Sequence, residues 1–341
     1  MGNDVKRRID WLDVLKCIGI FEIFLGHFYS SAGRAYPFVF THHVQLFFLC
    51  GGFAENFRKE SDWKHTFLEK SLSLLLPFFF FSILSMGVTV LLVQCDLMDA
   101  LKLCKGIVGG GVRNRYFASP LWFLTCLYVM ECMFFWIQKA RNRWLMVGVS
   151  LLLSVAATKL IPEIPSWPYN VDSAFYYLPF YGIGYAAFPL IYHALQDFKK
   201  HWKGIAVSGL LSAGYALCVF YGIEPFAFLN RFSLFSILFV YLKPLMIIWS
   251  LILLAYALRR IRLLQRLGRN TLYLCGNEYN VRALLPALLS PFGIELQWST
   301  PLRTALFCGL YVLLCYAAFC PWQKKAVLWI RRRIEKRLKS L

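Results

Sequence analysis

Apolar stretches of about twenty residues recur along the chain, separated by short segments that carry most of its charges. A helix of about that length crosses the hydrocarbon core of a bilayer. The pattern predicts ten spanning helices, at residues 11–31, 38–57, 68–94, 119–138, 144–160, 174–195, 204–221, 232–257, 271–290 and 303–321. We therefore expect an all-α fold, a polytopic membrane helix bundle.

The basic residues outside these windows, or within three residues of their ends, predict the orientation of the bundle. With the N-terminus inside, 26 Lys and Arg residues fall on the inner side and 8 on the outer side. Cytoplasmic loops of membrane proteins are enriched in Lys and Arg, so both termini are expected in the cytoplasm. Residues 1–323 then form a single transmembrane domain. Residues 324–341 have apolar positions at helical spacing among basic ones, which is typical of a tail lying on the inner membrane surface.

Composition agrees with a membrane setting, because 59% of the residues are hydrophobic and only 16% are charged. That balance excludes a soluble domain of this size. The net charge of +19 could indicate nucleic acid, but the basic residues punctuate apolar segments instead of forming one binding face. We expect membrane lipids as surroundings and no nucleic acid partner. The 11 cysteines lack the spacing of zinc ligands, so no metal is expected.

The first apolar stretch carries Asp13, Lys16, Glu22 and His27, and charged or ionisable residues inside a membrane helix are functional candidates. The eleven steps from Lys16 to His27 make about three helical turns, so both side chains share a face. They lie roughly 16 Å apart along the axis, which is comparable to the extended pantetheine arm of coenzyme A. Asp13 precedes Lys16 by one turn and is expected to steady it. Glu22 faces elsewhere.

Two further histidines, His42 and His43, begin the second window at the depth where His27 ends the first. Antiparallel neighbours with a short connection pack side by side, so the three histidines are expected to converge. They could bind a metal or handle protons. No carboxylate or cysteine is placed with them, which favours the proton-handling site.

The expected inner loop from Glu55 to Lys70 is basic, with Arg58, Lys59, Lys64 and His65 between its ends. One interpretation is the ordinary excess of positive charge on the inner side. The other is a socket for the phosphates of a cytosolic nucleotide-bearing donor, since ammonium and guanidinium groups suit phosphate oxygens. The sequence leaves both open.

The expected outer loop, residues 94–120, contains three consecutive glycines followed by Arg113 and Arg115. Such a loop can grip an acidic ligand or simply be mobile, and the sequence does not decide. Trp122 follows at the outer boundary, where tryptophan is typical of the interfacial aromatic belt, and it is also a site candidate.

Two acidic residues complete the list of candidates. Asp172 ends a proline-rich loop and is expected to act as a helix N-cap more than as a substrate contact. Glu278 lies four residues before Arg282 on one helix face, and this intramembrane pair can be purely structural.

An ordered series of motifs resembles acyltransferase family three, the multispanning O-acyltransferases that modify cell-surface glycans. The family pairs Arg or Lys with a His eleven residues later, as Lys16 and His27 stand here. The resemblance continues in His43-Val-Gln-Leu-Phe-Phe-Leu-Cys-Gly-Gly-Phe53, Lys70 with Leu76-Pro77, Leu121-Trp-Phe-Leu124, Pro179-Phe-Tyr-Gly-Ile-Gly184 and Leu267-Gly-Arg-Asn-Thr-Leu272. Gly51 replaces the usual Ser, and Glu278 stands where many members carry a His.

The resemblance implies an acyltransferase of the bacterial cytoplasmic membrane. Such an enzyme moves an acyl group, usually acetyl, from cytosolic acyl-coenzyme A to a hydroxyl of a cell-surface or lipid-linked glycan. On this hypothesis Lys16, with Asp13 and Lys70, holds the charged end of the donor, and its thioester arm reaches His27. His27 then acts as the catalytic base or becomes acylated itself.

A transporter or flippase for a glycan or a lipid-linked precursor is the alternative, because it also needs buried charges and kinked helices. Two repeated halves with broken half-helices would favour it, and the sequence shows no such repeat. A purely structural membrane protein would not need the stripe of Asp13, Lys16 and His27.

Reporter fusions test the orientation. A fusion after Leu341 is expected to report the cytoplasm, and a fusion within residues 100–115 the outer side, because the basic residues divide so unevenly. A C-terminus on the outer side would overturn this arrangement and with it the cytosolic placement of Lys16.

Overall fold

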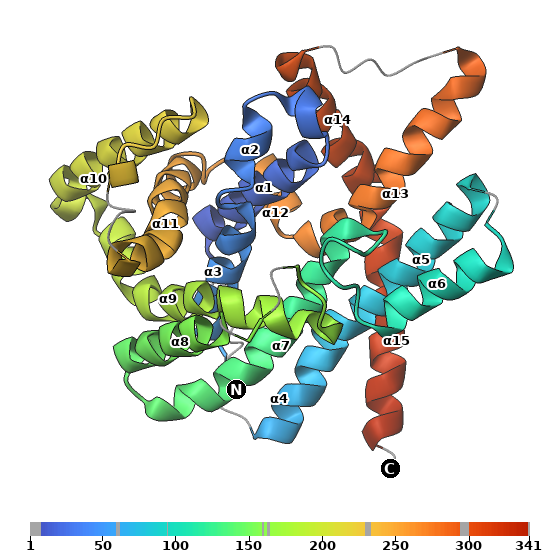
Figure 1. The fold of residues 1–341 in the computed structure, drawn as a ribbon, viewed down its shortest axis with the longest axis horizontal. Helices are drawn as coiled ribbons and strands as arrows, with labels where there is room; N and C mark the ends of the chain where they lie inside the picture. The colour runs from blue at the N-terminus through green and yellow to red at the C-terminus, as the bar shows by residue number, and fades with distance from the viewer. Residues whose placement is uncertain are drawn as a thin grey trace. The chain divides into compact units, whose positions relative to one another are not determined.

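The computed structural model describes residues 8–58, 62–93, 95–158, 160–161, 164–228, 233–293 and 300–339. Most residues in these ranges lie in helices and none lies in a strand, so the predicted all-α class is confirmed (Figure 1). Lys59, the basic lead before Arg8 and the last two residues of the predicted tail lie outside the described residues.

Every predicted window contains a helix. The longer helices are α1 (Asp10–Gly26), α3 (His43–Glu55), α5 (Leu76–Leu92), α7 (Trp122–Ile137), α8 (Arg143–Ala157), α9 (Val171–Gln196), α10 (Phe198–Phe220), α11 (Ser233–Ala257), α13 (Thr271–Leu289), α14 (Pro301–Ala318) and α15 (Cys320–Lys339). Shorter or amphipathic ones are α2 (Ala35–Val39), α4 (Trp63–Lys70), α6 (Leu97–Val108) and α12 (Arg262–Gly268).

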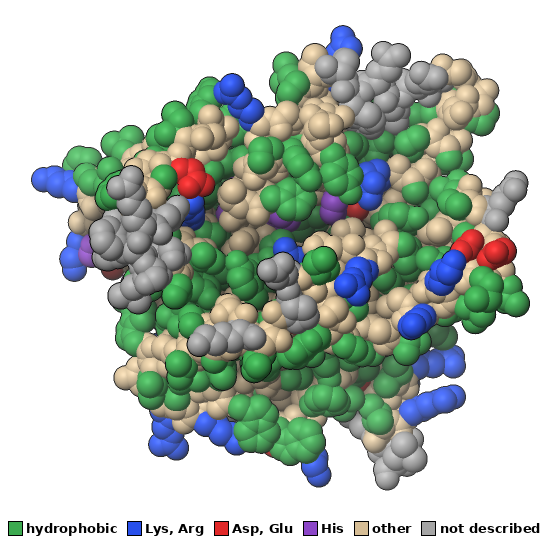
Figure 2. All heavy atoms as spheres, in the orientation of Figure 1, with side chains coloured by type: hydrophobic (Ala, Val, Ile, Leu, Met, Phe, Trp, Pro, Cys, Tyr) green, Lys and Arg blue, Asp and Glu red, His purple; other side chains and the backbone are tan. Residues whose placement is uncertain are grey.

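Five stretches of the described chain are long and apolar enough to cross a membrane: Trp63–Leu92, Ser119–Ala140, Phe198–Phe220, Ile237–Ala257 and Pro301–Ala318. Large apolar side chains are also exposed on them, including Ile83, Leu91 and Leu210. Figure 2 shows hydrophobic side chains spread over the visible face. Lipid, unlike water, tolerates this surface. The count of ten spans and the orientation stay predictions.

Three local features differ from the expected pattern. The window at 38–57 breaks after Val39 and resumes at His43, because Phe40, Thr41 and His42 form a turn. The expected outer loop contains a helix, α6, which at 12 residues is too short to span a membrane. The helix that contains the predicted tail, α15, starts at Cys320, before residue 324, and its Val327 is buried.

The chain divides into two compact units. The first comprises Met1–Arg58, Pro179–Thr271 and Trp298–Cys308, and the second comprises Lys59–Leu178, Leu272–Gln297 and Gly309–Leu341. The first unit contains α1 and α12, and the second contains α5, α7 and most of α13. The prediction of a single transmembrane domain over 1–323 stays a prediction.

Helix α1 lies in the core of the first unit. Its Trp11, Val14 and Leu15 pack in one apolar cluster with side chains of α3, α9 and α11. Helices α3 and α9 cross backbone to backbone: a Cβ on Gly52 would overlap the carbonyl of Tyr181, and one on Gly184 would overlap that of Leu49. Small residues that permit such crossings are common in membrane helix packing. This crossing fixes the positions of α3 and α9, two of the helices that pack around α1.

Candidate functional site

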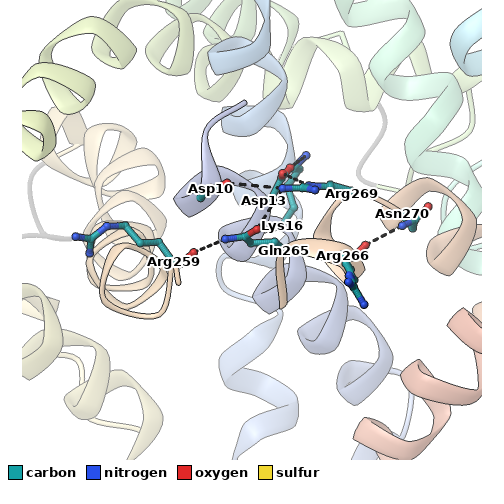
Figure 3. A network of polar contacts seen from close by, with 8 residues as sticks. All are labelled: Asp10, Asp13, Lys16, Arg259, Gln265, Arg266, Arg269 and Asn270. Atoms are coloured by element: carbon teal, nitrogen blue, oxygen red, sulfur yellow. Dashed lines mark hydrogen bonds and ion pairs between the residues drawn. The ribbon is translucent and has the colours of Figure 1, made fainter. Parts of the chain in front are cut away.

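One end of the candidate site forms where α12 meets the start of α1. The two backbones touch, because a Cβ on Gly268 would overlap the carbonyl oxygen of Asp13. Only glycine fits this position. The contact places the next residue, Arg269, directly beside the Asp13 side chain (Figure 3).

Asp13 accepts from two cations at once. Lys16 Nζ lies 2.9 Å from Asp13 Oδ1, and Arg269 Nε donates to Asp13 Oδ2 at 2.9 Å. Arg269 also lies 3.7 Å from the Asp10 carboxylate and donates to Gln265 Oε1 at 3.2 Å. Asp13 is buried, whereas 28% of the Lys16 side chain and 31% of the Arg269 side chain are exposed. A buried carboxylate thus holds two reachable cations in fixed positions.

This geometry suits an anion with several oxygens, such as a phosphate. The predicted contact between Asp13 and Lys16 is confirmed, while the role of Lys16 and Asp13 in donor binding stays a prediction. Sequence reasoning missed Arg269 as their partner. The signal was present in the motif Leu267-Gly-Arg-Asn-Thr-Leu272, to which we assigned no role.

His27 closes the other end of α1. It follows Gly26 as the C-cap, and its backbone N–H donates to the carbonyls of Ile23 and Phe24. Its side chain is half-buried. The eleven-residue spacing from Lys16 therefore runs along one uninterrupted helix up to its cap.

His43 approaches the same end of α1 through the turn between α2 and α3. Its Nδ1 lies 2.5 Å from the carbonyl oxygen of Val39, and its ring lies 4.9 Å from that of Phe40. Gly26 packs against both Val39 and Phe40. The segment of Val39 and Phe40 thus contacts both His43 and the residue before His27, while the convergence of the three histidines stays a prediction.

His42 is fully buried and pairs with Glu22 of α1, with 3.0 Å between Nε2 and Oε1. The Thr41 hydroxyl donates to the Phe38 carbonyl and lies 3.1 Å from His42 Nδ1. Both ring nitrogens of His42 thus have a polar partner.

The expectation that no carboxylate accompanies the histidines is therefore wrong, because Glu22 turns away from His27 and meets His42 instead. Within the described ranges, no group of three or more His, Cys, Asp or Glu residues could hold a metal ion.

The remaining candidates lie in the second unit. Lys70, at the end of α4, forms an ion pair with Glu131 of α7, with 2.5 Å between Nζ and Oε2. Both side chains are largely buried. Lys70 and Lys16 belong to different units, so their joint action on one donor stays a prediction.

Trp122 and Asp172 differ from their expected roles. Trp122 is only 8% exposed, so it is a core residue of the second unit and not part of an interfacial belt. Asp172 is fully buried inside the first turn of α9, and its carboxylate accepts from the backbone N–H groups of Ser166, Trp167 and Ser173. It is not the N-cap, because the helix begins one residue earlier; it anchors the preceding loop.

Glu278 is 1% exposed and binds Arg282, with 2.8 Å between Oε1 and Nε, which confirms the predicted pair. The neighbouring Asn277 exchanges amide hydrogen bonds with Gln323 of α15. These contacts tie α13 to α15 inside the second unit.

A family model described as an acyltransferase domain, acyltransferase family three, matches residues 9–320. The chain belongs to this family. The match begins just before α1 and ends at the first residue of α15, so it includes every candidate residue. No curated protein and no solved structure gives a match to the chain. This family three acyltransferase is an integral membrane protein.

The charge network at Asp13 gives a first test on the purified acyltransferase. The predicted role of Lys16 in donor binding, extended to Arg269, requires that Lys16→Ala and Arg269→Ala each weaken acetyl-coenzyme A binding by roughly tenfold or more, the effect of losing one charged hydrogen bond. Because both cations share Asp13, their effects should not add.

Titration calorimetry in detergent measures the dissociation constants. Arg266→Ala is the matched control, since Arg266 lies on α12, the helix that Arg269 caps, and its side chain is exposed. Unchanged donor affinity in both Lys16→Ala and Arg269→Ala would remove this cluster from donor binding.

The buried pair of Glu22 and His42 gives a second test. His42→Ala leaves Glu22 buried without its partner and should destabilise the protein by about 3 kcal/mol. The double variant Glu22→Met, His42→Phe keeps apolar volume without a stranded charge and should regain most of that loss. Thermal unfolding in detergent measures both. A His42→Ala variant that melts like the wild type would show that the pair carries little energy.

Proposed function

We propose that this acyltransferase moves an acetyl group from cytosolic acetyl-coenzyme A to a hydroxyl of a cell-surface or lipid-linked glycan. The observation that supports it best is the construction of α1. One end of the helix carries the cations Lys16 and, through Asp13, Arg269; the other end carries His27. The axial separation of roughly 16 Å matches the reach of a pantetheine arm.

The donor would bind by its phosphates at the exposed faces of Lys16 and Arg269. Asp13 holds the two cations in fixed positions relative to each other. The pantetheine arm then follows α1, so that the thioester reaches the level of His27.

At His27, a neutral imidazole accepts the proton of the acceptor hydroxyl as its oxygen attacks the thioester carbonyl. The new bond is between the acceptor oxygen and the acyl carbon, and the bond that breaks joins that carbon to sulfur. The imidazolium returns the proton to the departing thiolate, which leaves as coenzyme A. No other co-reactant is needed.

A covalent route uses the same residue. The imidazole nitrogen of His27 attacks the thioester carbonyl carbon, the carbon–sulfur bond breaks, and the thiolate takes the proton of the acyl-imidazolium and leaves as coenzyme A. The acceptor oxygen then attacks the acyl carbon, the carbon–nitrogen bond breaks, and the imidazole nitrogen takes the hydroxyl proton. The two routes differ in whether label from the donor stays on the protein when no acceptor is present.

We place the enzyme in a bacterial cytoplasmic membrane, with the donor side inside and the acceptor side outside. The excess of Lys and Arg on the expected inner side supports this orientation. A transporter or flippase for a glycan precursor remains the alternative outcome of the test that follows, since it would move its cargo without acyl transfer.

The test is transfer of radiolabelled acetyl from acetyl-coenzyme A to the envelope glycan fraction, in membranes of host cells that lack the native gene. The wild type should restore transfer, and His27→Ala should lower it at least about a hundredfold because general base catalysis is lost. Donor binding and folding should remain. His201→Ala, an exposed histidine of α10, is the control.

Near-normal transfer by His27→Ala would remove His27 from the mechanism. Absence of any acetyl transfer by the wild type, together with movement of a glycan precursor across the membrane, would favour the transporter.

A further inference from the structure

The loop between α6 and α7 is held in place by Asn170, which is fully buried. The Asn170 side-chain amide donates to the carbonyls of Gly110 and Gly111 and to the Thr125 hydroxyl. Its Oδ1 accepts from the backbone N–H of Arg113 at 2.7 Å. One side chain thus fixes both the start of the loop and the backbone of Arg113.

The glycines of this loop allow the fixation. Gly110 and Gly111 have φ values of +78° and +64°, which favour glycine. A Cβ on Gly110 would overlap the backbone of Tyr169. The Tyr169 backbone N–H donates to the Gly109 carbonyl at 2.9 Å. The sequence left open whether this loop is mobile or grips an acidic ligand. These contacts favour a loop with a fixed backbone that holds Arg113 in one position.

Arg113 lies over two aromatic rings of the second unit. Its guanidinium carbon is 5.1 Å from the ring centre of Trp122 and 5.3 Å from that of Tyr177. These are cation–π distances, and both rings belong to largely buried residues. The rings hold the guanidinium in a half-buried position, and its five N–H donors are more than its contact with the Tyr177 hydroxyl takes up.

Within the described ranges, no carboxylate forms an ion pair with Arg113. The contrast with other half-buried cations of the same unit is clear, since Lys70 binds Glu131 and Arg282 binds Glu278. Holding a cation partly out of water without a counter-ion costs free energy. An anion that binds such a cation offsets this cost, so the position favours anion binding.

We propose that Arg113 is a binding site for an anionic group, a carboxylate or a phosphate, on the glycan acceptor. The guanidinium fork matches the two oxygens of such a group, and the Trp122 and Tyr177 rings fix the direction of the fork. This rests on the proposed function. It adds that the acetylated sugar, or a sugar adjoining it, is acidic.

The first arm of the test compares variants in the acetyl transfer assay. Arg113→Gln should raise the KM for the acceptor roughly tenfold or more, with the KM for acetyl-coenzyme A unchanged, because a charged hydrogen bond to the acceptor is lost. Arg113→Lys should recover only part of this, since an ammonium keeps the charge but not the fork. Arg115→Gln is the matched control, because Arg115 lies in the same loop and is exposed.

Equal acceptor KM values for Arg113→Gln and wild type would overturn the proposal. A fall in kcat alone, with both KM values unchanged, would also overturn it, since that pattern means Arg113 only supports the fold around Trp122.

The second arm identifies the product without any variant. Nuclear magnetic resonance of the glycan acetylated by the wild type should show a carboxylate or phosphate on the acetylated sugar or on its neighbour. An acetylated glycan whose repeat is neutral would overturn the role of Arg113 and leave the acyltransferase function intact.

The third arm separates an acidic acceptor from an anionic lipid headgroup. In vesicles of phosphatidylcholine alone, the KM difference between wild type and Arg113→Gln should persist. A difference seen only when phosphatidylglycerol is added would assign Arg113 to the lipid and overturn the proposal.

Discussion

The organisation of the candidate site depends on the Asp13 carboxylate, which Lys16 and Arg269 share. Lys16 lies one helical turn away, but Arg269 is 256 residues distant and arrives only because Gly268 lets α12 touch the backbone of α1. The carboxylate offsets the repulsion between two neighbouring cations, and the cations offset its burial. From this point α1 runs without interruption to His27, so the length of a rigid helix sets the distance between the two ends of the proposed donor site.

Similar polar contacts join other elements in both units. In the first unit, Glu22 of α1 binds His42 in the turn between α2 and α3, and Glu55 of α3 accepts from the Tyr181 hydroxyl of α9. In the second, Lys70 pairs with Glu131. An unpaired charge among apolar helices is expensive, so each pair favours one register of the helices that carry it. Apolar side chains contribute less to fixing the register, because an apolar side chain has nearly the same free energy in lipid as in the protein interior.

The parts of this structure that follow from local sequence could be predicted, and the parts that need tertiary contacts could not. The windows of apolar residues located the helices, and helical spacing placed Asp13 beside Lys16. Spacing also showed that Glu22 faces away from His27, but not that it meets His42, because that contact depends on how the chain turns between α2 and α3. The position of Trp122 in the sequence suggested an interfacial residue, but its ring packs against Tyr177 and lies under the guanidinium of Arg113. The motif around Gly268 contributed to the family resemblance, but it did not predict the contact of Gly268 with the backbone of α1.

The central claim is that the donor lies along α1, with the donor's phosphates at the Lys16 end of the helix and the donor's acyl carbon at the His27 end. A structure of the protein with a non-cleavable thioether analogue of acetyl-coenzyme A tests this most directly. The claim predicts phosphate oxygens within ion-pair distance of Lys16 and Arg269, and the carbonyl carbon of the analogue within contact distance of His27. A bound analogue that touches neither cation, or whose carbonyl lies away from His27, would contradict it.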